Sequence, residues 1–177
     1  VVVTMHQKTD PDAMGSSLAL AGILAQLGHE VTVISPTNWP DFLKWMPGSK
    51  AVIDFEAARE KANAALDKAE WLFCLDFNAL HRTKHMAAKL SELNCIKILI
   101  DHHEQPETEA FDYGISLTVK SSTSEMVYDF IKASGNEHLI NENVAACLYA
   151  GIIGDTGSFR FPATSPDVHE MVAALKR

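Results

Sequence analysis

Short apolar runs alternate along the chain with segments of helical composition. Four runs are rich in aliphatic, β-branched or aromatic residues and resemble strands buried in a parallel sheet: Val1–Met5, Val31–Ile34, Trp71–Leu75 and Ile96–Ile100. A fifth, Ile115–Val119, alternates between apolar and polar positions as an edge strand does. Strands that alternate with helices predict a doubly wound α/β fold, with a mainly parallel five-stranded sheet and helices on both faces.

The segments between these runs predict five helices: Asp12–Leu27, Glu56–Lys68, Thr83–Leu93, Ser124–Ala133 and Asn141–Ile153. Ser35–Gly48 contains three prolines and two tryptophans, so we expect a packed loop with at most one helical turn. Val52–Phe55 is a candidate for a further short edge strand.

Both ends of the chain suggest that it was trimmed from a longer protein. The first residues already form a strand pattern, and Ser165–Arg177 begins like a helix, with a serine cap and a proline in the first turn, but has no terminating signal. We therefore expect residues 1–177 to be one domain of a longer protein, from which a targeting segment could also have been removed.

Composition narrows the class of protein. Hydrophobic residues make up 47% and charged residues 21% of the chain, as in an ordinary soluble globular protein. A formal net charge of −8 argues against binding to long duplex DNA or to a membrane, and no apolar run is long enough to cross a bilayer. The three cysteines, Cys74, Cys95 and Cys147, lie in or beside apolar runs, which favours free thiols and a cytoplasmic location.

Acids and histidines follow several of the apolar elements. They are Asp101-His102-His103 after the strand at 96–100, Asp76 after the strand at 71–75, His6, Asp10 and Asp12 after the first strand, and Asp155 among glycines. Taken singly, each has an ordinary explanation: Asp12 as a helix cap, Asp76 as the first residue of a loop, and one imidazole as a core group. Taken together, they predict a crowded rim of the sheet, where ligands bind in open α/β folds.

Clustered carboxylates repel one another unless cations neutralise them. Oxygen and imidazole ligands without thiolates suit manganese, magnesium or a similar hard ion better than structural zinc. The ligands suffice for two ions that share one carboxylate, an arrangement that holds both oxygens of a phosphoryl displacement. The sequence therefore predicts a centre of two divalent metal ions.

The motifs resemble those of the DHH phosphoesterase superfamily. His6-x-x-x-Asp10-x-Asp12, Asp76, Asp101-His102-His103 and Gly154-Asp155 occur in the order and approximate spacing of its four motifs. Ala13–Ser17, Ser121–Glu125 and Thr156–Phe161 resemble its oligoribonuclease and pAp-phosphatase branch, which is nanoRNase-like and exopolyphosphatase-related. The family usually has Pro-Asp-Gly-Asp where this chain has Thr9-Asp10-Pro11-Asp12, and the family's C-terminal substrate-binding domain, of the DHHA1 type, is absent.

The resemblance implies a role for each matched residue. His6, Asp10 and Asp76 would bind one ion, and Asp12, Asp76, His102 and Asp155 the other, with Asp76 as the bridge. Manganese is the expected ion, with magnesium and cobalt as alternatives. His103 would face the substrate phosphate and Asp101 would orient a ligand histidine. Arg160 is a candidate phosphate clamp, with a solvated loop arginine as its alternative; Arg82 and Ser122, with Ser121, are weaker candidates for substrate contacts.

The resemblance also implies an activity. We expect a manganese-dependent phosphodiesterase or phosphatase that hydrolyses short oligoribonucleotides, 3′-phosphoadenosine 5′-phosphate (pAp), or both, with hydroxide activated by two metal ions. An inorganic pyrophosphatase or polyphosphatase and a cyclic-dinucleotide phosphodiesterase remain alternatives. From another class, so does a non-catalytic nucleotide-binding regulatory module.

A Rossmann-like dinucleotide binder is disfavoured, because no Gly-x-Gly-x-x-Gly follows the first strand. The expected partner is a short oligonucleotide or a small phosphorylated nucleotide, and a homodimer of the full-length protein is compatible with the sequence. We expect residues 1–177 alone to bind metal but to turn over substrate poorly, and to expose apolar surface where the missing domain docks.

Overall fold

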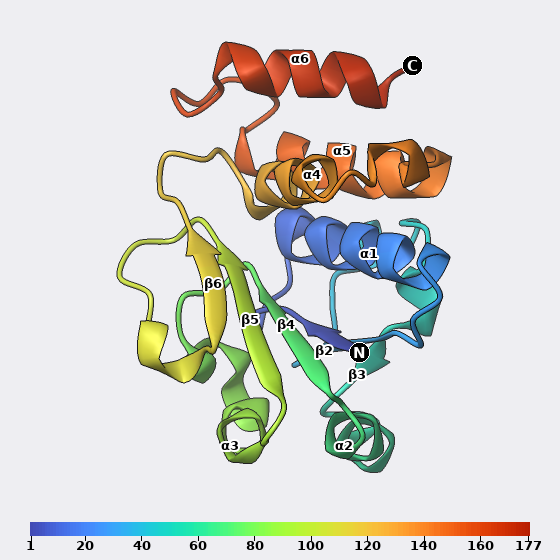
Figure 1. Ribbon diagram of the computed structural model, residues 1–177, viewed down its shortest axis with the longest axis vertical. Helices are drawn as coiled ribbons and strands as arrows, with labels where there is room; N and C mark the ends of the chain where they lie inside the picture. Colours follow the sequence, from blue (N-terminus) through green and yellow to red (C-terminus); the bar gives the residue numbers. More distant parts are fainter.

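A parallel sheet of six strands forms the centre of the computed structural model, which describes all residues from 1 to 177 (Figure 1). The strands are β1 (Val2–Thr4), β2 (Thr32–Ser35), β3 (Ile53–Asp54), β4 (Trp71–Leu75), β5 (Ile96–Asp101) and β6 (Tyr113–Ser116). Their spatial order is β3-β2-β1-β4-β5-β6. The predicted doubly wound α/β fold is confirmed, with six strands instead of five, because Ile53 and Asp54 pair with the end of β2.

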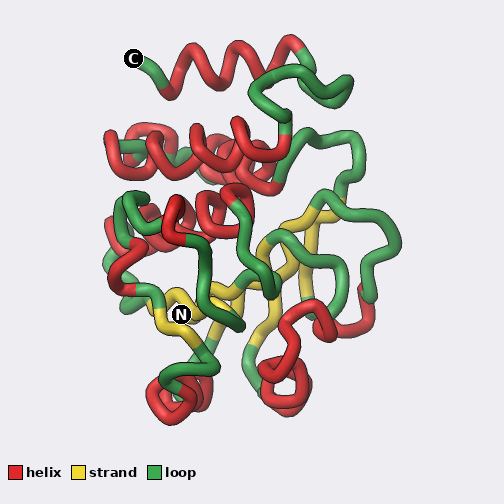
Figure 2. Tube along the Cα trace, turned by 180° about the vertical axis from the view of Figure 1, so that it is seen from behind, coloured by secondary structure: helices red, strands yellow, loops and turns green.

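Helices cover both faces of this sheet. They are α1 (Pro11–Gln26), α2 (Arg59–Asp67), α3 (Ala87–Glu92), α4 (Thr123–Ala133), α5 (Glu142–Asp155) and α6 (Pro166–Leu175). α1, α4 and α5 lie on one face with α6 outermost, and α2 and α3 lie on the other (Figure 1). Figure 2 shows the same layers from behind. None of these helices combines the length and the hydropathy that a bilayer crossing requires.

Most predicted elements shift by one to three residues at an end, and two differ more. The helix expected at 83–93 is a 3₁₀ segment, Leu80–Met86, followed by α3, and Lys84 breaks it with φ 54° and ψ −121°. The last edge strand ends at Ser116 instead of Val119. This strand begins at Tyr113, because the preceding residue, Asp112, pairs with Lys97 of β5. The backbone N–H of Asp112 donates to the carbonyl of Lys97 (2.9 Å), and its carboxylate accepts from the Lys97 N–H (2.8 Å).

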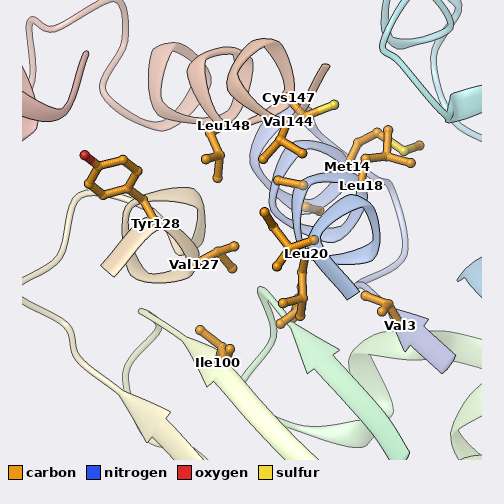
Figure 3. Close-up of a cluster of buried hydrophobic side chains, with 14 of the residues drawn as sticks. Val3, Met14, Leu18, Leu20, Ile100, Val127, Tyr128, Val144, Cys147 and Leu148 are labelled. Carbon is orange, nitrogen blue, oxygen red and sulfur yellow. The ribbon is translucent and has the colours of Figure 1, made fainter. Parts of the chain in front are cut away.

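The core lies in two layers, one on each face of the sheet. The larger layer joins residues such as Val3 and Ile100 from the strands to Leu18, Val127 and Leu148 from α1, α4 and α5 (Figure 3). The smaller layer lies under α2 and α3 and includes Val2, Ile34, Leu72, Phe77 and Leu90. Burial on both faces explains why these strands read as continuous apolar runs.

Close packing of α1 against α5 depends on small residues. A Cβ atom added at Gly15 would lie 2.4 Å from the carbonyl oxygen of Cys147, and one added at Gly154 would lie 2.8 Å from Cβ of Pro11. The helices therefore approach nearly backbone to backbone, and the first residues of α1 lie beside the last turn of α5.

The strand order reverses between β1 and β4. From β1 the chain proceeds outward through β2 and β3, and from β4 outward through β5 and β6. Connections therefore leave in opposite directions at this point, and the crevice outside the carboxyl ends of these two strands is where open α/β sheets bind ligands.

Candidate metal centre

The six predicted metal ligands come together at this crevice. His6, Asp76 and His102 follow the carboxyl ends of β1, β4 and β5, respectively. The other three lie on the flanking helices: Asp10 and Asp12 at the start of α1, and Asp155 at the last residue of α5.

The first group consists of His6, Asp10 and Asp76, whose ligand atoms lie within 4.8 Å of one another. Nε2 of His6 is 3.4 Å from Oδ2 of Asp10 and 3.3 Å from Oδ2 of Asp76. Nδ1 of His6 lies 2.6 Å from the carbonyl oxygen of Gln7. An N–H at Nδ1 that donates to this carbonyl leaves the lone pair of Nε2 free for a cation.

The N-cap of α1 is Asp10 and not Asp12, the residue that the sequence offered for this role. Asp10 is the N-cap of α1, since its Oδ1 accepts from the N–H of Ala13 (2.9 Å), and its Oδ2 faces His6. Asp12, the cap candidate in the sequence, is fully buried. Its two carboxylate oxygens accept from backbone N–H groups at the start of α4.

The second group gathers around His102. Its Nε2 lies 3.1 Å from Oδ2 of Asp155, 3.5 Å from Oδ1 of Asp76 and 3.9 Å from Oδ2 of Asp12. Nδ1 lies 3.3 Å from the carbonyl oxygen of Lys120, which again leaves Nε2 toward the acids. This Nε2 atom is buried and has no well-aligned hydrogen bond to these oxygens. A buried imidazole nitrogen that faces three carboxylates is suited to bind a cation together with them.

Asp76 belongs to both groups. Its Oδ2 faces His6, and its Oδ1 faces His102. The residue is almost fully buried, and its backbone has a left-handed φ of 63°. A non-glycine residue in this region carries on the order of 1–3 kcal/mol of strain, which the surrounding structure must offset. The backbone N–H of Asp76 donates to the carbonyl of Ile100 (3.1 Å), which holds the turn against β5.

The charges of the site are strongly coupled. Burial alone would lower the pKa of His6, but the carboxylates of Asp10 and Asp76 raise it from 6.5 to about 10. Burial likewise opposes the charge of His102, yet Asp155 and Asp76 raise its pKa to about 11. Asp76 shows the reverse: burial favours its neutral form, and the two imidazoles hold its pKa below the usual range of an aspartate.

Asp12 has the opposite electrostatic balance. Burial, followed by the negative charges of Asp76 and Asp155, raises the pKa of Asp12 well above its ordinary value. A carboxylate in this position is repelled by its neighbours unless positive charge is added. Without metal, the protonated imidazole of His102 provides part of that charge.

The available donors fit a hard divalent cation. Both groups consist of imidazole nitrogens and carboxylate oxygens, and none of the three free cysteines belongs to either. Manganese and magnesium favour such ligands, whereas structural zinc sites are usually rich in thiolate. The buried Nε2 of His102 and the crowded carboxylates together indicate that this site could hold a divalent metal.

His103 and Asp101 form a hydrogen-bonded pair at the edge of the site. His103 also lies near the candidate ligands: its Nδ1 is 3.8 Å from Oδ1 of Asp76, and it could form a third ligand group with Asp76 and His102. Nδ1 of His103 lies 2.6 Å from Oδ1 of Asp101, and the His103 backbone N–H donates to Oδ2 of the same carboxylate (3.1 Å). Asp101 is fully buried, whereas His103 is partly exposed. Asp101 therefore orients His103 in the structure, and it makes no hydrogen bond to the imidazole of His6 or His102.

Unlike the predicted metal ligands, three of the residues predicted to contact substrate lie in different surroundings. Arg160 is exposed, and its Nε donates to the carbonyl of Gly157 (2.6 Å). The carbonyl of Arg82 accepts from the N–H of Gln7 (2.8 Å), beside the first motif, and Arg82 forms no ion pair. Ser122 is fully buried, and its Oγ accepts from the N–H of Glu125, so it caps α4.

The sequence analysis did not predict that the start of α4 hydrogen-bonds two of the candidate metal ligands. The N–H groups of Thr123 and Ser124 donate to the two oxygens of Asp12, at 2.6 and 2.8 Å. The hydroxyl of Thr123 donates to Oδ1 of Asp76 (2.9 Å). Ser122 and Glu125 have the spacing of a capping box, which marks a helix start, but the partners of that helix start come from distant parts of the chain.

Comparisons with known proteins find relatives that match most of this chain. The model of the DHH family, N-terminal domain, matches residues 1–152. A relative from Streptococcus mutans, "Probable bifunctional oligoribonuclease and PAP phosphatase NrnA", is 30% identical over 167 residues, which cover 93% of this chain and 48% of the relative. A "Probable manganese-dependent inorganic pyrophosphatase" of the same organism is 27% identical, covering 99% of this chain and 55% of the relative.

A solved structure is also very similar. The crystal structure of an exopolyphosphatase-related protein from Bacteroides fragilis superposes with a TM-score of 0.96 at 38% identity, covering 99% of this chain and 51% of that one. The chain thus spans about half the length of the relatives that it matches. With the family model aligned over 152 of the 177 residues, the chain belongs to the DHH family and carries its N-terminal domain.

Proposed function

We propose that this chain is the metal-binding part of a phosphoesterase that hydrolyses short oligoribonucleotides, pAp, or both, with two divalent cations, manganese being the expected ion. The observation that carries the proposal is the shared carboxylate. Oδ2 of Asp76 lies with the group of His6 and Asp10, and Oδ1 lies 3.5 Å from Nε2 of His102, the residue that also groups with Asp12 and Asp155. Two adjacent cations bridged by one carboxylate are suited to phosphoester hydrolysis.

The protein residues have distinct tasks in this proposal. His6, Asp10 and Asp76 would hold one ion, and Asp12, Asp76, His102 and Asp155 the other. When bound, such ions lower the pKa of water to near neutrality and stabilise charge on phosphoryl oxygens. The hydrolysis itself would form a P–O bond from water as the ester P–O bond breaks, and the proton released by that water would balance the one taken up by the leaving oxygen, without a covalent enzyme intermediate.

His103 is the proposed group that faces the phosphate. Its Nδ1 is held by Asp101, so its Nε2 is the atom that can donate a hydrogen bond to a phosphoryl oxygen or a proton to the leaving group. The side chain is about one-third exposed, whereas that of Asp101 is fully buried. This pairing fixes the orientation of the imidazole before substrate binds.

The names of the relatives support the choice of substrate. The relative with 30% identity is described as an oligoribonuclease and PAP phosphatase, and the pyrophosphatase is slightly less similar at 27%. Pyrophosphate is therefore the second candidate substrate. On this proposal, substrate selection lies partly in the half of the relatives' length that the chain does not span.

Replacement of the shared carboxylate tests the metal-dependent mechanism. In the full-length protein, we expect Asp76→Asn to lower manganese-dependent hydrolysis of a diribonucleotide by at least ~100-fold, the upper end of what removing a group behind a metal ligand costs. Asp41→Asn, which alters an exposed acid outside both groups, serves as the matched control. Near wild-type hydrolysis and manganese binding by Asp76→Asn would contradict the proposal.

A substrate panel distinguishes the candidate activities. Short oligoribonucleotides, pAp, pyrophosphate and cyclic di-AMP are compared by kcat/KM with manganese and with EDTA. We expect the first two to be preferred. Preference for pyrophosphate or cyclic di-AMP would reassign the substrate, and nucleotide binding without metal-stimulated hydrolysis would indicate a regulatory module.

A further inference from the structure

The start of α4 contacts both candidate metal groups without belonging to either. Ser121, Ser122, Thr123, Ser124 and Glu125 are all buried, although all five are polar. Buried polar groups are usually retained for a specific set of hydrogen bonds. The partners of this segment show what those bonds do.

One set of bonds holds Asp12. The N–H groups of Thr123 and Ser124 each donate to one oxygen of its carboxylate, at 2.6 and 2.8 Å. The positive end of α4 therefore faces a carboxylate that its neighbours Asp76 and Asp155 repel. These are backbone contacts, so the position of the α4 backbone determines the position of Asp12.

The Thr123 hydroxyl acts on the shared carboxylate. It donates to Oδ1 of Asp76 at 2.9 Å, the same oxygen that faces Nε2 of His102 at 3.5 Å. The other oxygen faces Nε2 of His6 at 3.3 Å and has no donor from α4. Rotation of an aspartate carboxylate about χ2 is soft, so its orientation is set by its hydrogen bonds and not by a rotamer preference.

We propose that Thr123 is a positioning residue that divides the Asp76 carboxylate between the two metal groups. Its hydroxyl fixes Oδ1 in the group of His102, and this leaves Oδ2 in the group of His6. Without the hydroxyl, the carboxylate is free to turn toward one group, and the second ion loses its bridging ligand. The inference rests on the proposed function, since it assumes that Asp76 binds both ions.

Glu125 holds Thr123 in the required place. Oε2 of Glu125 accepts from the N–H and the hydroxyl of Ser121, at 2.7 and 2.8 Å, and Oε1 accepts from Nζ of Lys120 at 2.9 Å. The carbonyl of Lys120 in turn lies 3.3 Å from Nδ1 of His102. The segment is therefore fixed on both sides of Thr123, so its hydroxyl meets Asp76 in a preset geometry.

Replacement of the hydroxyl alone tests the inference. In the full-length protein, Thr123→Val keeps the shape of the side chain and removes the donor, whereas Thr123→Ser keeps the donor. We expect wild type and Thr123→Ser to bind two manganese ions with the electron paramagnetic resonance signal of an exchange-coupled pair. For Thr123→Val we expect the second ion to bind ~10–100-fold more weakly and the coupled signal to be lost.

Several outcomes would overturn the inference. A coupled pair in Thr123→Val shows that the hydroxyl is not needed, and equal impairment in Thr123→Ser assigns the effect to the lost methyl group. If Thr123→Val does not fold, Thr123→Ala against Thr123→Ser gives the same comparison, because these two differ only in the hydroxyl. A wild-type protein that does not bind two ions would overturn the proposed function as well, which separates the two failures.

Discussion

At the scale of single residues, the site contains carboxylates that repel one another, and a bound cation would reduce this repulsion. Imidazoles with raised pKa values face carboxylates, and one buried carboxylate, Asp12, is destabilised by its neighbours. Asp76 adds local backbone strain, with its positive φ. Strain and clustered charge are typical of functional sites, where the surrounding fold over-determines the geometry.

The metal-free protein should lose stability as the pH rises above neutrality. His6 and His102 have folded pKa values of about 10 and about 11, both above the unfolded value of 6.5. Their contribution to the free energy of unfolding is complete below pH 6.5, declines above it and is lost once the pH passes 10 to 11. Thermal unfolding in EDTA between pH 6.5 and 10 measures this slope.

A comparison of two histidine variants identifies the source of the slope. His6→Asn should show a shallower decline with pH than wild type, because one raised pKa is removed. His29→Asn, at an exposed histidine that forms no ion pair with an acid, should leave the slope unchanged. Equal slopes for His6→Asn and wild type would contradict the assignment.

At the scale of elements, the close contact of α1, α4 and α5 makes the site possible. Asp10 and Asp12 lie at the start of α1, Asp155 ends α5, and α4 presents its N–H groups to Asp12. Gly151 on α5 lies at the junction: a Cβ atom there would come within 2.0 Å of Oγ of Ser124 and 2.9 Å of Oδ1 of Asp12. The absence of a side chain at this position leaves the space in which α4 reaches the carboxylate.

Gly151→Ala should therefore destabilise both the protein and the metal site. Overpacking of this kind costs ~1–3 kcal/mol, more than the ~1 kcal/mol that alanine contributes to a helix relative to glycine. Gly22→Ala, at a helical glycine where the added Cβ meets only the tip of Val144 at 3.0 Å, is the matched control. Urea unfolding and manganese titration measure the two effects. Wild-type stability and affinity in Gly151→Ala would show that α4 and Asp12 move aside at little cost.

At the scale of the whole molecule, the two candidate metal groups bring together residues from the sheet and from the helices that cover it. The candidate ligands come from the ends of three strands, from the start of α1 and from the end of α5. The chain carries a net charge of −8, and several of its buried acids meet in this one place. Folding without cations therefore concentrates charge repulsion at the crevice.

Manganese should accordingly stabilise the folded chain. At a free concentration 100-fold above the dissociation constant, one site adds about 2.7 kcal/mol to the free energy of unfolding. We expect calorimetric melting to show a higher Tm with manganese and a reversal with EDTA. Asp76→Asn should lose most of this increase, and Asp41→Asn should keep it. An unchanged Tm in wild-type protein at saturating manganese would contradict the presence of a native metal site.

Several large apolar side chains remain exposed, and most of them lie in two regions. Phe42 and Trp45 project from the loop after β2, and Tyr113 and Val119 lie on and just after the edge strand β6. The expectation that a second domain docks on exposed apolar surface remains a prediction.

Much of the fold and the positions of the candidate ligands could be inferred from the sequence alone. Parallel strands buried on both faces must be continuously apolar, and polar residues that follow them must emerge at one rim of the sheet. His6, Asp76 and His102 were predictable in this way because each directly follows such a strand. Short strands were less predictable: β6 is displaced because Asp112 pairs with Lys97, a contact between side chain and backbone that periodicity does not contain.

Only the tertiary structure decided which atoms meet. Thr123 donates one hydrogen bond to Asp12, which is 111 residues away in the sequence, and another to Asp76, which is 47 residues away. The different surroundings of the two Asp76 oxygens likewise depend on how the start of α4 packs, because Thr123 donates to only one of them. A sequence pattern specifies which face or end of an element a residue occupies, whereas hydrogen bonds depend on the distance and angle between elements, which the packing of the whole core sets.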